Sequence, residues 1–336
     1  MEEGIVGGIT TKDLAQMCGV SRTTVNRALS GTGRISPDTK ERILRVAREH
    51  DYRPDLLARG LVKGRTYYIG VVVLDVKNRY FAQMLSTIGT AANKQGYSIN
   101  IVLHNNDRQM EQNQLMKLAA YHMDGIILSS VNEGEEYRKF LSTLGMPIVS
   151  VDNKIADGLP FVSIDQKKAM QEVTALVLEK GYRKLVFVCP PMDARAKENV
   201  YVHEERLKGF QEALHEFPEA EAEYLLDWSY LEKAEQLAKS GARVAFVCTS
   251  DGFALDIMKR LESIGKKPPV DYGITGFDNI DTLDYVKPRL STVSNSVDMV
   301  AETAVELLMA MIEQEEDEQR VTCHILPHEI VPGETV

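Results

Sequence analysis

Side chains that can contact nucleic-acid bases gather in one short segment near the beginning of the chain. The run RTTVNR contains Arg22, Thr23, Thr24, Asn26 and Arg27. Arginine can form two hydrogen bonds with guanine, asparagine can do the same with adenine, and the threonine methyl group can pack on thymine. Each good contact discriminates between bases by about 1 to 3 kcal/mol. These residue types at this spacing predict a surface that reads DNA sequence.

Three predicted helices must position these side chains. A first helix spans residues 11–18, where apolar residues recur at helical spacing. Gly19 permits a tight turn, Ser21 is a good N-cap for a second helix, and Val25 closes a small core. A third helix opens at a Ser-Pro pair and covers residues 36–50. The pattern is typical of a helix-turn-helix.

An alternative interpretation is a helical hairpin with no role in DNA binding, which leaves the polar outward positions unexplained. Arg34 lies in an exposed loop between helices, where it can clamp a phosphate or simply be solvated, and both interpretations stay open. The predicted DNA contacts in this region are Thr11, Ser21, Arg22, Thr23, Thr24, Asn26, Arg27 and Arg34.

Charge is divided unevenly along the 336-residue chain, whose net charge is −10. Residues 1–65 hold 12 Lys and Arg against 8 Asp and Glu, a balance of +4, which leaves 27 against 41, a balance of −14, for the rest. A small basic module on an acidic body is expected where only the module contacts phosphates, because the acidic remainder repels DNA and limits non-specific binding.

Composition excludes several other classes of protein. With 44% hydrophobic and 26% charged residues, the chain has the composition of a soluble globular protein. Neither a membrane span nor a signal peptide is recognisable, so we expect a cytoplasmic protein. The cysteines Cys18, Cys189, Cys248 and Cys323 are far apart in the sequence, which argues against a disulfide framework or a zinc site. We expect no metal and no cofactor.

The larger remainder alternates short apolar strands with amphipathic helices. Strands are predicted in YIGVVVL, SINIVLH, DGIILSS, KLVFVC, RVAFVCTS and YGITGF, and helices lie between most of them. This order predicts an α/β fold with parallel sheets in two similar halves. Such sheets bind ligands in crevices at the carboxyl ends of their strands.

At this point the sequence resembles a known family. The stretch from TTKDLAQMCGVSRTTVNRALSGTGR through YRPDLLARGLVKGRT is similar to the head of lactose-repressor-family regulators. The resemblance implies that the helix after Ser21 enters the major groove and that Leu61, on a hinge helix, wedges into the minor groove. Two departures from the family pattern are Gly60, where serine is usual, and Asn26, which replaces a common serine.

The resemblance extends over nearly all of residues 10–336 to the family's periplasmic-binding-protein-like effector domain. It implies a helix-turn-helix domain at 9–52, a hinge helix and linker at 53–66, and a two-lobed effector-binding and dimerisation domain at 67–336. The first lobe is expected at about 67–163 and 296–323, and the second at about 164–295 and 324–336.

By the same resemblance, the effector cleft is expected to contain aromatic, acidic, basic and hydroxyl side chains. Tyr80 and Phe81 can equally be core aromatics, Arg206 can be a surface residue, and Asp152 and Asp278 can cap strand-end turns. The complete set is Asn78, Tyr80, Phe81, Ser129, Asp152, Arg206, Trp228, Ser250 and Asp278. The segment 190–205 is longer than in the family pattern and can be either a cover of the cleft or a surface loop.

The sequence as a whole predicts a DNA-binding transcriptional regulator. Motifs typical of nucleotide-binding enzymes, serine hydrolases and zinc proteases are missing, so we expect no enzyme activity. The predicted protein is a homodimeric repressor of carbohydrate-uptake or catabolic genes that binds a near-palindromic operator and a sugar or sugar-phosphate effector. The alternative is a regulator whose body responds to a purine-like corepressor or to a partner protein.

Overall fold

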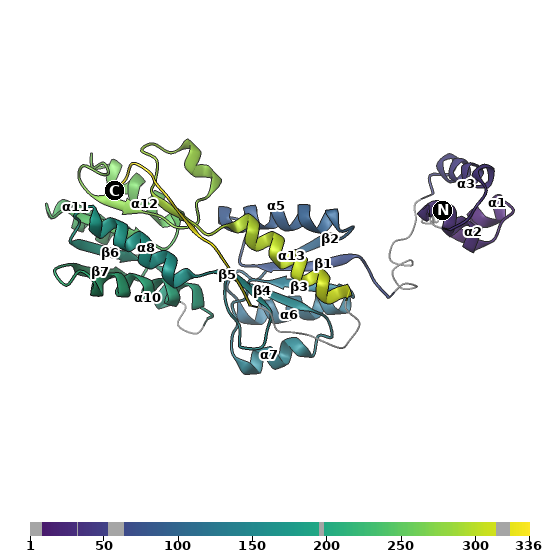
Figure 1. Ribbon diagram of the computed structural model, residues 1–336, viewed down its shortest axis with the longest axis horizontal. Helices are drawn as coiled ribbons and strands as arrows, with labels where there is room; N and C mark the ends of the chain where they lie inside the picture. The colour runs from purple at the N-terminus through teal and green to yellow at the C-terminus, as the bar shows by residue number, and fades with distance from the viewer. Residues whose placement is uncertain (1–8, 32, 53–63, 195–197, 314–322) are drawn as a thin grey trace, which may run out of the picture. The chain divides into compact units, whose positions relative to one another are not determined.

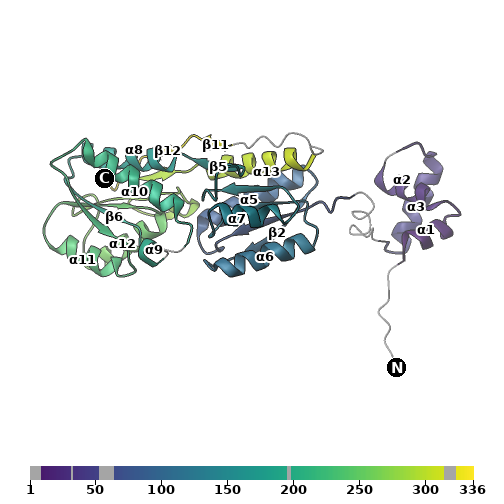
Figure 2. The ribbon, with the colours of Figure 1, turned by 90° about the horizontal axis from the view of Figure 1, so that it is seen from below.

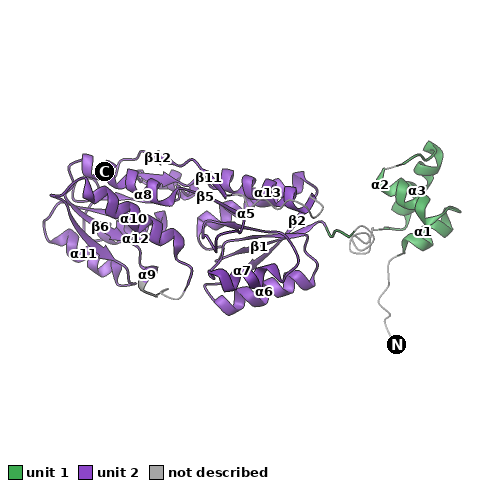
Figure 3. Cartoon of the chain, turned by 60° about the horizontal axis from the view of Figure 1, so that its bottom comes forward, with its two compact units in different colours: residues 1–66 green, residues 67–336 purple. Residues whose placement is uncertain are grey.

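The computed structural model describes residues 9–31, 33–52, 64–194, 198–313 and 323–336. The chain divides into two compact units, residues 1–66 and 67–336, each of which is described by itself (Figure 3). We call the first unit the head and the second the body.

In its described residues, the head is a bundle of three short helices, α1 (Thr11–Met17), α2 (Arg22–Ser30) and α3 (Pro37–Glu49). Side-chain oxygens of Thr10, Ser21 and Ser36 accept hydrogen bonds from backbone N–H groups in the first turns, which fixes where the helices begin. The turns need glycine, because Gly19 and Gly31 have φ angles of 59° and 69°. The predicted helices are confirmed.

Apolar residues from all three helices form the core of the head. Leu14, Val25 and Ile43 are fully buried, one from each helix. This arrangement leaves the polar side of α2 on the surface of the head.

The first lobe of the body is a parallel six-stranded sheet. In spatial order its strands are β11 (Cys323–Leu326), β5 (Phe161–Ile164), β4 (Ile148–Val151), β3 (Gly125–Leu128), β1 (Tyr68–Val73) and β2 (Ser98–Leu103). Helices α5 (Arg79–Lys94) and α13 (Val297–Glu313) cover one face, and α6 (Arg108–Ala120) and α7 (Glu135–Ser142) cover the other (Figure 1). Because both faces are covered, β3 and β4 are buried along their whole length.

The second lobe has a parallel four-stranded sheet. Its strands, in spatial order, are β7 (Glu221–Leu225), β6 (Lys184–Val188), β8 (Val244–Cys248) and β9 (Gly273–Thr275). Helices α8 (Gln166–Glu179) and α10 (Tyr201–His215) lie on one side and α11 (Tyr230–Lys239) and α12 (Asp251–Glu262) on the other (Figure 2). Two short helical turns, α9 (Pro191–Ala194) and η1 (Asp281–Tyr285), complete this lobe.

The chain passes between the lobes more than once. After β5 it enters the second lobe, and after β10 (Thr292–Ser294) it returns as α13 to the first. Strand β11 then pairs with β5, and β12 (Glu329–Val331) pairs with β10 in a small antiparallel sheet. The two lobes predicted from the sequence pattern are thus confirmed as a fold.

No helix in the described ranges is long and apolar enough to span a membrane.

Helices α8 and α10 pack unusually closely. A Cβ atom built on Gly209 of α10 would lie 2.0 Å from the backbone oxygen of Lys167 in α8, which no side chain can tolerate. Gly252 of α12 is a useful contrast, since a Cβ there would meet only the Ser250 Oγ, at 3.6 Å. Only glycine therefore fits where α10 crosses α8.

Gly209→Ala should lower the free energy of unfolding of the body by about 1 to 3 kcal/mol or more, because α10 must move away from α8. The same substitution at Gly252 should be neutral or stabilising by up to about 1 kcal/mol, since alanine favours a helix. Urea unfolding followed by circular dichroism measures both. Equal stability of the two variants would contradict the close packing.

Candidate functional site

The outward side of α2 carries polar side chains that have no partner among the described residues of the head. Arg22, Thr23, Asn26 and Arg27 are exposed, and between described residues none of their side chains makes a hydrogen bond or ion pair. Arg34, which is also exposed, lies in the loop between α2 and α3. The head therefore presents these donors to an external partner.

Three other predicted DNA contacts have roles within the head. The Ser21 Oγ accepts a hydrogen bond from the Thr24 N–H at 3.1 Å and lies 2.9 Å from the Thr24 hydroxyl. The Thr11 hydroxyl is 2.8 Å from the Tyr52 hydroxyl, which joins α1 to the end of the bundle. Leu61 lies outside the described residues, so its predicted place in the minor groove stays a prediction.

A cleft in the body encloses about 830 Å³ of space, its open mouth included. The residues on its walls come from both lobes, and they include eight of the nine predicted effector contacts: Asn78, Tyr80, Phe81, Ser129, Asp152, Arg206, Ser250 and Asp278. The side chains that the family resemblance implies are thus brought to one place.

The guanidinium of Arg206 is the centre of the cleft wall in the second lobe. Arg206 is buried, and its Nε donates to the Gln166 Oε1 at 2.9 Å. One terminal nitrogen donates to the Thr249 carbonyl, and the other lies 3.6 Å from the Asp278 Oδ1. The guanidinium also stacks 3.6 Å from the centre of the Phe277 ring. Arg206 is therefore held rigidly by the protein before any ligand binds.

Asp152 faces this cleft from the first lobe, at the end of β4. Its Oδ1 accepts a hydrogen bond from the Tyr80 hydroxyl at 2.7 Å, whereas its buried Oδ2 has no partner among the described residues. Burial raises the pKa of Asp152 to about 6, although the Tyr80 hydroxyl and the Arg206 guanidinium both lower it. An unpaired buried carboxylate oxygen is costly, and a ligand hydroxyl can satisfy it.

Asp278 and Asp251 bring two more buried carboxyl groups near Arg206. Burial raises the pKa of Asp278 well above its usual range, Arg206 lowers it, and the two other aspartates raise it further. Burial also raises the pKa of Asp251 to about 7, although hydrogen bonds from the Thr292 hydroxyl and the Ile280 N–H lower it. One guanidinium therefore lies near three buried carboxyl groups.

The alternative interpretation of Asp152 and Asp278 is that their side chains cap turns at strand ends. In the described part of the chain, neither the Asp152 nor the Asp278 carboxyl group accepts a backbone N–H. Asp152 accepts from the Tyr80 hydroxyl, and Asp278 accepts from the Asn295 amide and pairs with Arg206. Both residues have positive φ angles, 60° and 112°, which are uncommon outside glycine. Strained backbone of this kind often occurs at binding sites.

The other predicted contacts differ in how they meet the cleft. Tyr80 and Phe81 line it and are also packed in the hydrophobic core, so both interpretations apply. The Asn78 and Ser250 side chains accept hydrogen bonds from the first turns of α5 and α12. Trp228 is 59% exposed and does not line the cleft; its ring packs edge-on against Phe253, which does.

Several residues that line the cleft were not predicted. They share positions at strand ends or at the beginning of α10 and α12, and they include His104, Asn106, Ser130, Asn153, Asn199, His203, Thr249 and Phe253. For His104 and Asn153, which follow β2 and β4, the rule that ligands bind at the carboxyl ends of parallel strands was a usable signal. For Asn199 the only signal was its place in the long segment 190–205, which by sequence can be either a cover of the cleft or a surface loop.

No group of His, Cys, Asp or Glu side chains in the described ranges is arranged to hold a metal ion.

Comparisons with known proteins identify the family to which this chain belongs. The model for bacterial regulatory proteins of the lacI family matches residues 10–55, and the model for a periplasmic binding protein-like domain matches residues 174–336. Catabolite control protein A of Streptococcus mutans serotype c is 31% identical over 317 residues, which are 93% of this chain and 94% of that relative. The chain belongs to the lacI family of bacterial regulatory proteins. The resemblance inferred from the sequence is confirmed.

Further relatives have similar descriptions. The HTH-type transcriptional regulator KdgR of Bacillus subtilis is 27% identical over 325 residues, which are 93% of this chain and 94% of the relative. Relatives of this kind are transcription regulators rather than enzymes. The protein is a DNA-binding transcriptional regulator with an effector-binding domain.

Solved structures share the fold. A lac repressor dimer bound to operator and an anti-inducer has a TM-score of 0.84 at 19% identity. The superposition covers 98% of this chain and 99% of the repressor chain. A complex of the regulator CelR with cellobiose has a TM-score of 0.67 at 21% identity. The superposition covers 98% of this chain and 100% of the CelR chain. A periplasmic binding protein/LacI transcriptional regulator from Alkaliphilus metalliredigens in complex with D-xylulofuranose has a TM-score of 0.70 at 24% identity. The superposition covers 80% of this chain and 98% of that protein's chain.

Asp152→Asn should weaken the pH dependence of the stability of the body. The folded-state pKa of Asp152, about 6, is above the usual 3.8, so this group favours the folded state at low pH and loses that contribution as pH rises through about 6. Between pH 4 and 7, the wild type should therefore lose on the order of 1 to 3 kcal/mol of unfolding free energy relative to the variant.

Urea unfolding followed by circular dichroism at each pH measures this difference. Asp284→Asn, at an exposed position, is the matched control. Parallel pH profiles for the wild type and Asp152→Asn would contradict the prediction.

Proposed function

We propose that the protein is a homodimeric repressor whose affinity for a near-palindromic operator is set by a sugar bound in the cleft of the body. The observation that carries the proposal is the group of Asp152, Arg206 and Asp278 on the cleft wall. The Oδ2 of Asp152 has no partner among the described residues, and a carboxylate oxygen accepts the hydrogen bonds that sugar hydroxyls donate.

Charge favours an uncharged sugar over a sugar phosphate. Arg206 is the cation held among three buried carboxyl groups, and three of its nitrogens already face protein partners. A phosphate group would need further cationic donors, and it would be repelled by Asp152, which is ionised above about pH 6. The solved neighbours in complex with D-xylulofuranose and cellobiose support a sugar as the class of ligand.

On the DNA side, Arg22, Thr23, Asn26 and Arg27 provide base and phosphate contacts from α2, with Arg34 beside them. Ser21 and Thr24 begin the helix, and Thr11 ties it to the rest of the head. The predicted role of Leu61 in bending the operator belongs to the same proposal. Because the protein is a dimer in this proposal, each head binds one half-site.

A thermal-shift screen tests the effector. Neutral sugars should raise the melting temperature of the full chain, and sugar phosphates should do so less or not at all. The stabilising sugar should lose most of its effect on Asp152→Asn and Asp278→Asn variants and little on Asp284→Asn. Stabilisation by purines alone, or by no small molecule, would overturn the sugar proposal.

Arg22→Ala and Arg27→Ala should weaken binding to the operator by about tenfold to a hundredfold, because each loses a base contact worth about 1 to 3 kcal/mol. Binding to random DNA should weaken far less. Arg45→Ala is the matched control, since Arg45 is an exposed arginine on α3 paired with Glu49. Fluorescence anisotropy with both DNAs at fixed salt measures the ratio. Equal losses on the two DNAs would indicate phosphate contacts only.

A further inference from the structure

The segment just before α10 connects the two lobes beside the cleft. Asn199 is buried, with 5% of its surface exposed, and it lies in the part of the chain that is longer than the family pattern. Its backbone N–H donates to the Val131 carbonyl at 2.9 Å. Its Nδ2 donates to the carbonyls of Asn132 and Lys154, at 3.2 and 3.1 Å. All three acceptors belong to loops of the opposite lobe.

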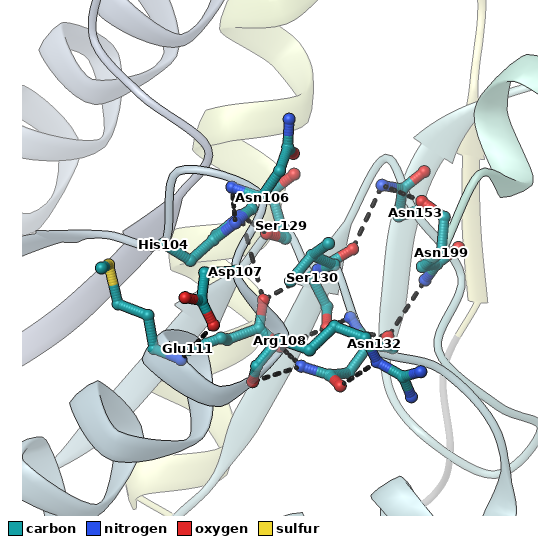
Figure 4. Close-up of polar contacts among 12 residues, drawn as sticks. His104, Asn106, Asp107, Arg108, Glu111, Ser129, Ser130, Asn132, Asn153 and Asn199 are labelled. Atoms are coloured by element: carbon teal, nitrogen blue, oxygen red, sulfur yellow. Dashed lines mark hydrogen bonds and ion pairs between the residues drawn. The ribbon is translucent and has the colours of Figure 1, made fainter. Parts of the chain in front are cut away.

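Asn153 reinforces this connection from the first lobe. Its Nδ2 donates to the Ser130 carbonyl at 3.2 Å and to the Asn199 carbonyl at 3.4 Å, and its Oδ1 accepts the Val202 N–H at 3.3 Å. We call this set of hydrogen bonds between Asn199 and Val202 on one side and residues 131, 132, 153 and 154 on the other the asparagine clasp. Figure 4 shows Asn153 and Asn199 beside Ser130 and Asn132.

The acceptors of the clasp are themselves fixed by a buried carboxylate. Glu111 of α6 is fully buried and accepts hydrogen bonds from the Ser130 hydroxyl at 2.7 Å and the Val131 N–H at 2.8 Å. It also accepts from the Asn132 amide at 3.0 Å and from the Tyr137 hydroxyl. Three of these four hydrogen bonds come from residues 130–132, so Glu111 holds this loop in place.

The clasp is linked to the ligand-binding arginine through α10. Arg206 follows Asn199 by seven positions, and the Asn199 Oδ1 accepts the Tyr201 N–H at 3.1 Å, at the first turn of the helix. A second connection between the lobes, the ion pair of Arg79 and Asp281, is about half exposed and contributes little. The buried clasp is therefore the stronger constraint on how far Arg206 lies from Asp152.

We propose that Asn199 is a positioning residue of the effector site: the asparagine clasp holds the two lobes together in the absence of ligand and so places Arg206 opposite Asp152. This proposal deepens the proposed function, because a cleft organised in advance binds its ligand at a smaller cost in ordering. Whatever ligand the cleft takes, its affinity then depends on side chains that do not need to touch it.

The distance between the lobes in the ligand-free full chain tests the clasp. Spin labels are placed on Lys139→Cys in α7 and Gln211→Cys in α10, both exposed, in a Cys323→Ser background that removes the exposed native cysteine. Labelled chains are diluted with unlabelled chains, so that distances within one chain dominate. The parent should give one narrow distribution.

Asn199→Asp should move the distribution to longer distances. It keeps the oxygen that accepts the Tyr201 N–H but replaces the donor to the Asn132 and Lys154 carbonyls by a second acceptor. The ratio of closed to open molecules should fall about tenfold or more. Asn153→Ala removes the hydrogen bonds of the clasp to the Asn199 carbonyl and the Val202 N–H and should move the distribution in the same direction.

Two controls separate this effect from others. Asn113→Asp makes the same chemical change at an exposed position of α6, and Val173→Ala lowers stability in the core of α8. Both should keep the parent distribution. Should Asn199→Asp not fold, Asn199→Ser and Asn153→Ala carry the same test.

An unchanged distribution in these clasp variants would overturn the proposal. Because the distances are measured without ligand, this result does not depend on a sugar being the effector. A sugar from the thermal-shift screen should bind the Asn199→Asp variant about tenfold more weakly and return its distribution to that of the parent. If the clasp variants keep the closed distribution and still bind sugar, the proposed function stands and the positioning role of the clasp is wrong.

Discussion

A buried guanidinium must be surrounded by hydrogen-bond acceptors, and this requirement organises the body of the protein. Arg206 meets it with acceptors from three separate elements: Gln166 of α8, Thr249 after β8 and Asp278 after β9. Removing a charge from water without such partners costs several kcal/mol. The close crossing of α8 and α10 at Gly209 makes this convergence possible, because it brings Arg206 within reach of Gln166. The second lobe is built so that this one side chain stays in place.

The same charge explains why the cleft lies between two lobes. Arg206 and Asp278 are on one side and Asp152 on the other, so neither lobe contains the complete set of polar groups. The carboxyl groups outnumber the guanidinium, and burial raises their pKa values for lack of enough counter-charge. In the proposed function, an uncharged sugar supplies hydrogen bonds to these carboxyl groups without adding another negative charge.

The head and the body differ in whether their polar side chains have hydrogen-bond partners within the protein. In the body, buried polar side chains such as Glu111 and Asn199 have several hydrogen-bond partners within the protein. The side chains on the outer side of α2 in the head have none between described residues. Such a surface costs nothing while water solvates it, and it is available to an external partner. This contrast matches the division of charge, +4 in residues 1–65 and −14 in the rest.

The sequence by itself determined the features that depend on near neighbours in the chain. Ser21 and Ser36 begin helices because they bond to N–H groups three positions away, and the alternation of strands and helices gave the two parallel sheets. The family resemblance added the cleft residues. Only the tertiary structure decided that Asn199 joins two loops of the other lobe, that Asp251 lies beside Arg206, and that Phe253 rather than Trp228 lines the cleft. These contacts join residues tens of positions apart, and their geometry depends on how helices and sheets pack, which local patterns do not encode.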